Sequence, residues 1–364
     1  MKNNNNLYCI IMAGGSGTRF WPISRKHKPK QFLDILGTGK TFLQMTYQRF
    51  ETIVPKENFY IVTNDEYVSL VKDQLPFLSN EQILGEPIGR NTAPCIEYAN
   101  QKIKAKNPQA NIIVTPADHL IIETDRFLQD VATAIGHISN NEALVTLGIT
   151  PTRPNTGYGY IQIDPSKPIN NSLYKVKTFT EKPNTEMAEF FVKSGEFLWN
   201  SGMFFWNLQT IEKAFEKYLP ETHNIFVKNF DKINSSKEKE IINEIYDQIK
   251  SISIDYAIME KADNVNVIKS SFTWSDLGTW FSLYENKPKD ANNNVINANQ
   301  NIIYDLKDSL LYTTLNDKIY AIKGFSDIIL VDTQDALLLI NKNDDQSIKQ
   351  IVNDMKINGK DKFL

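Results

Sequence analysis

Short apolar runs alternate with helical patterns through residues 7–149 of the chain. The apolar runs are LYCIIMA (7–13), NFYIVT (58–63), ANIIVTPAD (110–118) and EALVTLGI (142–149). The segments between them, TFLQMTYQRF, TAPCIEYANQKIKAK and DRFLQDVATAIGHI, have helical patterns. Continuous apolar strands separated by helices are typical of a mostly parallel sheet that is covered on both faces. The alternation therefore predicts an α/β fold.

The pattern changes from about Asn292 onward. Short β-rich runs follow one another there, punctuated by Asn, Asp and Gly and without helices between them, which predicts a small all-β domain. The segment QSIKQIVNDMK then spaces its apolar residues along one helical face and predicts a closing helix. ENKPKDANNN at 285–294 has little to bury and is the predicted linker. For a chain of 364 residues we therefore expect two domains, over 1–285 and 292–364.

Composition excludes several classes of function. The formal net charge of −3 leaves no excess positive field, which argues against nucleic acid as a partner, although a local basic cluster could still hold a phosphorylated small molecule. Cys9 and Cys95 form neither a disulfide framework nor a zinc spacing, which fits a reducing cytoplasm. No apolar stretch approaches the ~20 residues of a membrane span. The N-terminal MKNNNN lacks the apolar region of a secretory signal and is expected to be a frayed tail.

A glycine-rich stretch, IMAGGSGTRFWPISRKHKPKQFL (10–32), follows the first predicted strand. It would lie at the carboxyl edge of the sheet, where open α/β folds bind ligands, and glycines let backbone N–H groups approach phosphate oxygens. A dinucleotide site would need glycine where Phe20 stands, and a P-loop would need its lysine closer to the glycines than Lys30. Arg19 and Lys30 can instead bring a guanidinium and an ammonium to one polyphosphate. On this stretch alone, a turn without a ligand remains an alternative.

Acidic residues stand at two further points of interest. Asp118 directly follows a predicted strand and Asp276 lies in the turn signal of TWSDLGTW. A single Asp in such a place is more often a helix cap or a turn former than a metal ligand.

Glu181 and Lys182 are adjacent in FTEKP at a predicted strand end, so we expect their side chains to diverge. The residues alone favour a solvated surface there.

A series of segments occurs in the order AGGSGTRFWPIS, KPKQF, GEPIGRNTAP, TPADH, PNTGYGYI, FTEKP, WNSGMFFW, SIDYAIMEK and FTWSDLGTW. Together these segments resemble the sugar-phosphate nucleotidyltransferases, and within them the bacterial mannose-1-phosphate guanylyltransferases, over nearly the whole chain. The resemblance implies a Rossmann-like nucleotidyltransferase domain over 1–285 and a left-handed β-helix-like domain over 292–364. Longer bacterial members carry a phosphomannose isomerase domain after this unit, and we expect it to be absent from a chain that ends at Leu364 and has only four His.

The resemblance also implies roles for individual residues. Catalysis would fall to Arg19, Lys30, Asp118, Lys182 and Asp276, with Mg²⁺ held by Asp118 and Asp276. Lys182 would hold the sugar phosphate, and Glu181 and Asn200 would meet sugar hydroxyls. Glu86 would accept two hydrogen bonds from guanine, although a solvated Glu86 before Pro87 is as compatible with the local sequence. The implied substrate-binding residues are Ala13, Gly14, Gly15, Gly17, Thr18, Glu86, Asn91, Thr92, Gly157, Tyr158, Gly159, Glu181 and Asn200.

The implied reaction is GMP transfer from GTP to mannose 1-phosphate, with GDP-mannose and pyrophosphate as products. The sugar phosphate would attack the α-phosphorus in line, and His119 is not a general base because the attacking phosphate is already ionised. One alternative is another hexose 1-phosphate or nucleotide. A second is a non-catalytic sugar-nucleotide sensor on this fold, which should lack the charged residues that are present here. We expect a homodimer formed through exposed edges of the small β domain.

Overall fold

The computed structural model describes residues 5–15 and 17–364, so most of the predicted N-terminal tail lies outside the described residues. The described chain forms two compact units. Unit 1 contains the residues up to Gly14 together with Leu43–Ala117 and Ile121–Trp274. Unit 2 contains Gly15–Phe42, Asp118–Leu120 and Ser275–Leu364. The domain boundaries expected from the sequence, 1–285 and 292–364, stay a prediction.

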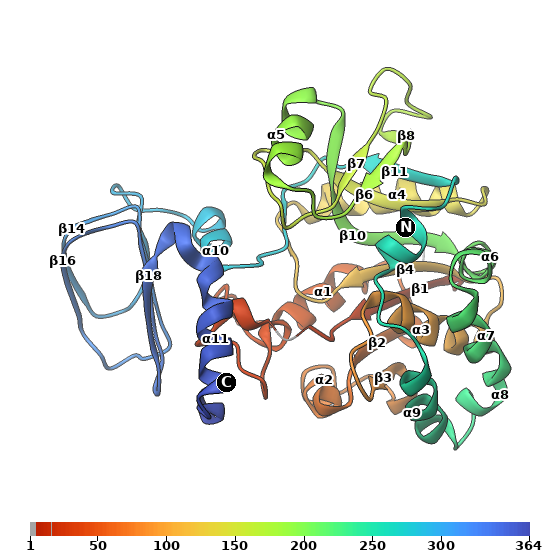
Figure 1. The fold of residues 1–364 in the computed structure, drawn as a ribbon, viewed down its shortest axis with the longest axis horizontal. Helices are drawn as coiled ribbons and strands as arrows, with labels where there is room; N and C mark the ends of the chain where they lie inside the picture. Colours follow the sequence, from red (N-terminus) through yellow and green to blue (C-terminus); the bar gives the residue numbers. More distant parts are fainter. Residues whose placement is uncertain (1–4, 16) are drawn as a thin grey trace. The chain divides into compact units, whose positions relative to one another are not determined.

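Unit 1 is built on a sheet in which ten strands take part among the described residues. The strand order is β3-β2-β1-β4-β10-β6-β11-β8, with β7 paired to β10 and β9 to β7 (Figure 1). The strands are β1 (Leu7–Met12), β2 (Phe59–Asn64), β3 (Ile83–Glu86), β4 (Asn111–Pro116), β6 (Leu144–Ile149), β7 (Tyr160–Gln162), β8 (Leu173–Lys175), β9 (Thr178–Thr180), β10 (Phe197–Asn207) and β11 (Val265–Lys269).

The predicted parallel sheet is confirmed for most of its centre. Strands β3, β2, β1 and β4 run parallel to one another, and β11 runs parallel to β6. The difference from the expected pattern is β10, which runs antiparallel to both β4 and β6. The sheet is therefore mixed, with an antiparallel strand inserted between two parallel groups.

Helices cover this sheet, and the three that the sequence predicts are present. They are α1 (Phe42–Phe50), α3 (Thr92–Lys106) and α4 (Thr124–Ile138). The others are α2 (Val68–Gln74), α5 (Thr185–Ser194), α6 (Leu208–Tyr218), α7 (Pro220–Lys228), α8 (Phe230–Ile233), α9 (Glu238–Gln248) and a π-helical turn, η6 (Asp255–Met259). The α3 helix packs on β1 and β2, whereas α4 packs on β6 and β10.

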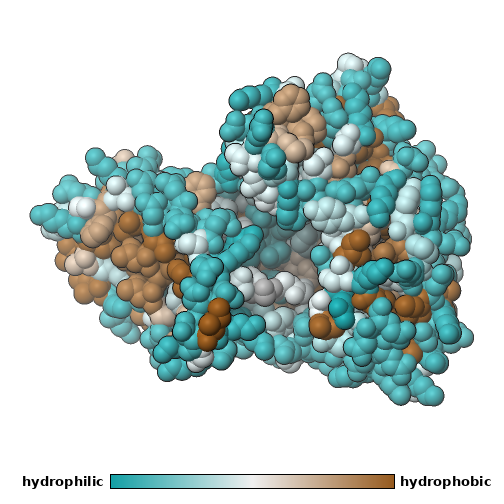
Figure 2. Space-filling view, in the orientation of Figure 1, coloured by the Kyte–Doolittle hydropathy of each residue, from teal (hydrophilic) through white to brown (hydrophobic). Residues whose placement is uncertain are grey.

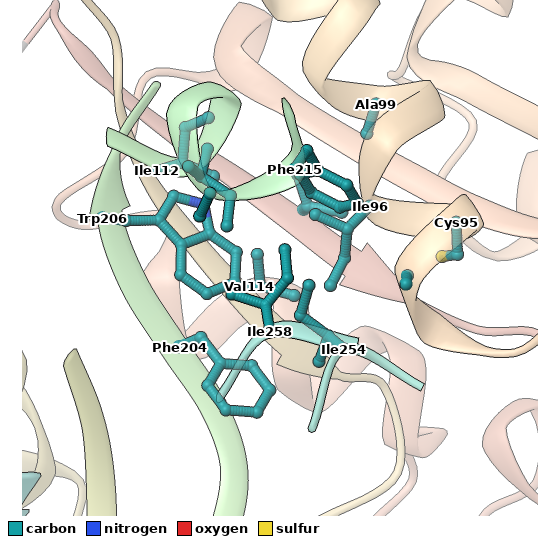
Figure 3. Close-up of a cluster of buried hydrophobic side chains, with 14 of the residues drawn as sticks. Cys95, Ile96, Ala99, Ile112, Val114, Phe204, Trp206, Phe215, Ile254 and Ile258 are labelled. Atoms are coloured by element: carbon teal, nitrogen blue, oxygen red, sulfur yellow. The ribbon is translucent and has the colours of Figure 1, made fainter. Parts of the chain in front are cut away.

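A buried apolar cluster joins one face of the sheet to its helices. Figure 3 shows Trp206 of β10 and Ile96 of α3 in this cluster, and Ile254 and Ile258 reach it from the π-helical segment. The expected core aromatics Trp199, Phe204, Phe205 and Trp206 are buried. Because Ile254 and Ile258 are both fully buried, the backbone between them is held in place against the sheet.

Unit 2 holds the predicted β region and its closing helix. Strands β13 (Val295–Asn297), β15 (Leu310–Thr313) and β17 (Ile328–Asp332) are parallel, as are β14 (Asn301–Lys307) and β16 (Tyr320–Ser326), and β18 (Leu337–Asn341) runs antiparallel to β17. Helices α10 (Trp280–Asn286) and α11 (Ile348–Ile357) flank these strands in the sequence. Helix α10 ends and β13 begins at the borders of the predicted linker. Short strands β5 (Leu120–Ile121) and β12 (Trp274–Ser275) lie where the chain passes between units.

Within the glycine-rich stretch, Phe20 and Trp21 pack in the core of unit 2. The Phe20 and Trp280 rings lie with centroids 4.9 Å apart, and Trp280 Nε1 donates to the Trp21 carbonyl at 3.0 Å. Trp21 Nε1 in turn donates to the Phe363 carbonyl at 2.8 Å. Aromatic packing of this kind explains why Phe20, and not a third glycine, stands after the loop. Phe20 and Trp21 are therefore anchored by the same core as the C-terminal strands.

Within the described part of the chain, every helix is too short or too polar to cross a membrane.

Candidate functional site

A pocket of about 270 Å³ in unit 2 brings together residues from distant parts of the sequence. Its lining includes Gly17, Thr18, Arg19, Lys30, Asp118 and Asp276, all of which the sequence predicts as site residues. Phe20, His119, Gly278 and Lys349 complete the lining. Gly15 lies outside this lining, and its carbonyl accepts a hydrogen bond from Gln31 Nε2 at 2.9 Å.

Gly17 has a backbone conformation that other residues rarely adopt. Its φ of 58° lies in the left-handed region, and a Cβ at this position would stand 2.7 Å from the Cβ of Lys30. Both features require glycine. The short helix η1 (Thr18–Phe20) begins directly afterwards and carries Arg19. The Nε atom of Arg19 is buried, and no described group accepts a hydrogen bond from it. Such a donor is costly unless an acceptor such as an anion meets it.

Lys30 connects the glycine-rich segment to both acidic positions. Its side chain is only 4% exposed, and its Nζ lies 5.7 Å and 5.2 Å from the ring centroids of Phe20 and Phe42. Nζ contacts Asp118 Oδ2 at 3.0 Å and donates to the main-chain carbonyl of Asp276 at 2.7 Å. The Lys30 ammonium therefore connects the segment that carries Asp118 to the segment that carries Asp276.

The pocket keeps two carboxylates beside its cations. Burial alone would raise the pKa of Asp118, but the charge and hydrogen bond of Lys30, with His119 contributing, lower it below its ordinary value. Asp276 lies in a tight turn in which its Oδ1 accepts a hydrogen bond from Gly278 N at 3.0 Å. The residue between them, Leu277, has a left-handed φ of 42°.

This donor set suits a magnesium ion that shares its ligands with phosphate. Mg²⁺ is usually held by one or two carboxylates together with substrate phosphates and waters. The side chains of residues 5–15 and 17–364 include no group of three or more His, Cys, Asp and Glu that could hold a metal without such help. Asp118 and Asp276 therefore fit a metal that arrives with a phosphorylated substrate.

Glu86 lies in unit 1, at the end of β3, and is only 5% exposed. The Tyr246 hydroxyl donates to its Oε1 at 2.9 Å. Burial raises the pKa of Glu86 to about 7, against a lowering effect of the Tyr246 hydrogen bond. A Cβ on Gly14 would lie 3.5 Å from Oε2, so the start of the glycine-rich segment borders this carboxylate. The alternative of a solvated Glu86 is therefore wrong.

Other predicted nucleotide-binding residues in unit 1 have structural contacts. The Ala13 carbonyl accepts a hydrogen bond from Thr63 Oγ1 at 2.9 Å. Asn91 caps α3, since its Oδ1 accepts from Thr92 N at 2.9 Å. The Thr92 hydroxyl accepts from Ile254 N at 2.8 Å and so connects α3 to the π-helical segment.

A second polar group in unit 1 gathers the residues expected on the sugar side. Lys182 forms an ion pair with Glu181, whose side chain is 9% exposed. The expected divergence of these side chains is wrong, because Lys182 follows the end of β9 with a left-handed φ of 49° and so leaves the strand alternation. A Cβ on Gly159 would collide with Glu181 Oε2. Tyr158 accepts a backbone hydrogen bond from Lys182 N at 3.2 Å, and Gly157 N donates to Asn155 Oδ1 at 2.8 Å.

Asn200 has its amide group fixed from both ends. Its Oδ1 accepts from Thr146 Oγ1 at 3.1 Å and from Gly202 N at 3.2 Å, while its Nδ2 donates to Asp255 Oδ1 at 2.8 Å. Burial and the nearby charge of Glu181 raise the pKa of Asp255 to about 6. The sequence prediction missed Asp255, although π-helical turns often occur at functional sites and the residue lies in SIDYAIMEK.

Comparison with known families assigns both parts of the chain. Residues 8–293 match the model described as "Nucleotidyl transferase". Residues 299–355 match the "MannoseP isomerase/GMP-like beta-helix domain". The predicted β-helix-like character of the C-terminal region is therefore confirmed, and the α/β class of the larger part agrees with the family of the first match.

Individual relatives cover almost the whole chain. Mannose-1-phosphate guanylyltransferase RfbM from Salmonella typhimurium is 37% identical over 360 residues, which are 97% of this chain and 73% of that protein. Alginate biosynthesis protein AlgA from Pseudomonas aeruginosa is 33% identical, over 96% of this chain and 72% of that protein. A solved structure of a mannose-1-phosphate geranyltransferase from Thermus thermophilus is similar with a TM-score of 0.85 and 28% identity, covering 96% of this chain and 99% of that one.

Proposed function

The chain belongs to the nucleotidyl transferase family, among its mannose-1-phosphate guanylyltransferases, and we propose how it transfers GMP from GTP to mannose 1-phosphate. The proposal rests on the pocket of unit 2 and on the polar groups around Glu86 and Glu181 in unit 1. The products are GDP-mannose and pyrophosphate. The family generally uses a divalent metal ion, and Mg²⁺ is the ion proposed here.

The observation that carries this proposal is the pocket of unit 2. Arg19 offers a buried Nε–H without an acceptor among the described groups, and Lys30 offers a buried ammonium. Asp118 and Asp276 line the same pocket. A triphosphate with a divalent cation complements this combination, because the phosphate oxygens accept from the cationic side chains and the carboxylates hold the metal.

The reaction needs positioning and charge neutralisation more than acid or base chemistry. An oxygen of the sugar phosphate forms a bond to the α-phosphorus of GTP while the bond to the β-phosphate oxygen breaks, and no proton has to move. Arg19 and Lys30 neutralise charge on the triphosphate and on the leaving pyrophosphate. When bound to Asp118 and Asp276, Mg²⁺ supplies further positive charge at the phosphate oxygens. Gly17 and Thr18, which line the pocket, are assigned as backbone donors to the same phosphates. Gly15, which lies outside the lining, is assigned as a further backbone donor.

Base recognition is assigned to Glu86. Guanine presents N1–H and an exocyclic amino group side by side, and an ionised carboxylate can accept from both. Tyr246 orients the carboxylate through its bond to Oε1, which leaves Oε2 on the side of Gly14. We assign Ala13, Gly14, Asn91 and Thr92 to the same nucleotide-binding role. The burial of Glu86 supports the assignment. A buried carboxylate that a base leaves without hydrogen bonds costs free energy, so it discriminates strongly between bases.

Sugar recognition is assigned to the group around Glu181. Lys182 holds the attacking phosphate, and Glu181 accepts from a sugar hydroxyl beside Gly157, Tyr158 and Gly159. The amide carbonyl of Asn200 is already occupied, and one of its N–H groups donates to Asp255. We therefore assign Asn200 mainly to orienting Asp255, whose second carboxylate oxygen accepts from a further hydroxyl.

The decisive experiment mixes the protein with GTP, Mg²⁺ and mannose 1-phosphate and measures pyrophosphate and GDP-mannose. Production of both is expected, and the same assay with UTP, dTTP and ATP, and with other hexose 1-phosphates, tests the alternative substrates. A sugar-nucleotide sensor would bind GDP-mannose in calorimetry and release no pyrophosphate. Absence of turnover with every pair of substrates would refute the proposal.

The same proposal includes a homodimer and a cytoplasmic location. Apolar surface gathers over β14, β16 and β18 in Figure 2, where Tyr304 is 61% exposed and Phe325 50% exposed. Contact with a second copy would cover such a surface. Sedimentation should give a dimer for the wild type and a lower mass for Tyr304→Glu, whereas Phe190→Glu, at an exposed aromatic residue of unit 1, should leave the mass unchanged. A monomeric wild type would contradict the dimer. The buried free thiols of Cys9 and Cys95 support the location.

A further inference from the structure

Lys349 lies in the same pocket as the glycine-rich segment, although it belongs to the C-terminal helix α11. The pocket's other lysine and arginine side chains are Arg19 and Lys30, and its aspartates are Asp118 and Asp276. The sequence patterns assign α11 only a closing role in the small β domain. The structure thus adds a cation to the phosphate pocket from a region without a predicted catalytic residue.

Packing of α11 fixes the position of Lys349. Ile348 is fully buried in the core that also contains Phe20 and Trp280. Ile351, one turn further along the helix, packs against the same core. Because neighbouring residues in an α-helix point about 100° apart, the residue after Ile348 leaves the core at its edge. That edge is the pocket, since α11 packs against η1, the short helix that carries Arg19.

We propose that Lys349 is a further catalytic residue, whose ammonium contacts phosphate oxygens of GTP and of the leaving pyrophosphate. The proposal rests on the function assigned above to the pocket and extends it, because the C-terminal unit then supplies part of the active site. The sugar phosphate is assigned to Lys182 in unit 1, so Lys349 should act on the nucleotide and pyrophosphate and not on mannose 1-phosphate.

The charge balance of the pocket supports this role. Apart from Lys349, the lysine, arginine and aspartate side chains of the pocket lining are two cations, Arg19 and Lys30, and two carboxylates, Asp118 and Asp276. A triphosphate brings about four negative charges, which one divalent cation neutralises only in part. An additional ammonium at the pocket reduces the remaining negative charge, and it gains most when charge develops on the departing pyrophosphate.

The test compares Lys349→Gln with Lys356→Gln. Both variants remove one exposed lysine from α11, but Lys356 lies outside the pocket lining. We expect Lys349→Gln to raise the KM for GTP, and the KM for pyrophosphate in the reverse reaction, by about tenfold at low salt, and by less at high salt. The KM for mannose 1-phosphate should change little, and Lys356→Gln should match the wild type. Lys349→Arg keeps the positive charge and should retain most of the wild-type affinity for GTP and pyrophosphate.

Calorimetry of GTP binding to the full chain with Mg²⁺ gives a readout that does not depend on turnover. Weaker GTP binding by Lys349→Gln, with unchanged thermal unfolding, is the expected result. Equal GTP and pyrophosphate constants in Lys349→Gln and Lys356→Gln would overturn the proposal, as would a loss confined to mannose 1-phosphate. Failure of the proposed function would show differently, as a wild type that produces no GDP-mannose, and the GTP titration would still decide the role of Lys349.

Discussion

Replacing Glu86 by glutamine should change how the stability of the protein depends on pH. Burial raises the pKa of Glu86 from its ordinary 4.5 to about 7, so the folded chain holds a proton that the unfolded chain releases between these values. The folded state is therefore favoured at low pH, and this contribution is lost as the pH rises through about 7. At about 1.4 kcal/mol for each pKa unit, ionisation of Glu86 lowers the free energy of unfolding by about 3.5 kcal/mol in total.

The Glu86→Gln side chain has the same shape and is neutral at every pH. Its Oε1 can still accept from the Tyr246 hydroxyl, which keeps the contact that orients the side chain. The variant therefore avoids the cost of ionising a buried carboxyl. Relative to the wild type, its free energy of unfolding should rise by about 2.5 kcal/mol between pH 5 and pH 8.5.

Urea unfolding of both proteins without nucleotide, at a series of pH values, measures this difference. Glu51→Gln removes an exposed carboxylate of unit 1 and serves as the control, with a difference that stays small across the series. If the difference between Glu86→Gln and the wild type did not grow with pH, the buried-carboxyl reasoning would be refuted.

The same variant tests base recognition independently of stability. An amide presents a donor to a guanine donor, and the mismatch costs ~1–3 kcal/mol. The ratio of kcat/KM for GTP to that for UTP, dTTP and ATP should therefore fall by roughly ten- to a hundredfold. An unchanged ratio, with the stability effect present, would mean that Glu86 is buried but does not read the base.

Further predictions concern the phosphate and sugar groups. Asp118→Asn and Asp276→Asn should each abolish most pyrophosphate release while thermal unfolding stays unchanged. The double variant should lose little more activity than either single variant. Full activity in either single variant would contradict a shared metal. Lys30→Ala should raise the KM for GTP and pyrophosphate, whereas Lys182→Ala should raise the KM for mannose 1-phosphate. If both variants changed the KM of the same substrate alone, the assignment of Lys30 to the nucleotide and Lys182 to the sugar phosphate would be contradicted. Asp255 lies near Asn200, Glu181 and Lys182, and its pKa is raised to about 6. The affinity for mannose 1-phosphate should therefore weaken more steeply below about pH 6 in the wild type than in Asp255→Asn, which should bind weakly and keep only the titration of the substrate's own phosphate. Equal pH profiles for the two proteins would contradict this role of Asp255.

The strands and helices of unit 1 could be predicted because their signals are local. A continuous apolar run such as LYCIIMA forms β1, and the pattern of TAPCIEYANQKIKAK forms α3, within a residue or two of the expected bounds. The direction of β10 could not be predicted in this way. Its pairing with both β4 and β6 depends on the path of the chain through β7, β9 and α5, and the WNSGMFFW segment itself carries no signal of direction.

Site residues that lie close behind the end of a strand could be predicted from the sequence. Site residues whose position depends on one backbone angle, or on contacts with distant parts of the chain, could not. Asp118 lies two residues beyond the end of β4 and joins part of the glycine-rich stretch in one pocket, as expected. The pairing of Glu181 with Lys182 depends on one left-handed residue, which the strand pattern does not indicate. Asp255 gains its setting from the amide of Asn200, which comes from a distant strand.

The packing of Phe20 and Trp21 indicates a structural role for the C-terminal region in this enzyme. In open α/β folds a loop after the first strand is ordinarily supported by the sheet and its helices. Here Phe20 and Trp21 are buried against Trp280 and the C-terminal strands, so the backbone that carries Arg19 is held by the core of unit 2. Gly17, which has a left-handed backbone conformation, is thereby held in place before a ligand binds, and a pre-organised phosphate site loses less entropy on binding. The β-helix region therefore acts as the support of the phosphate pocket, and Lys349 is the point at which that support reaches the substrate.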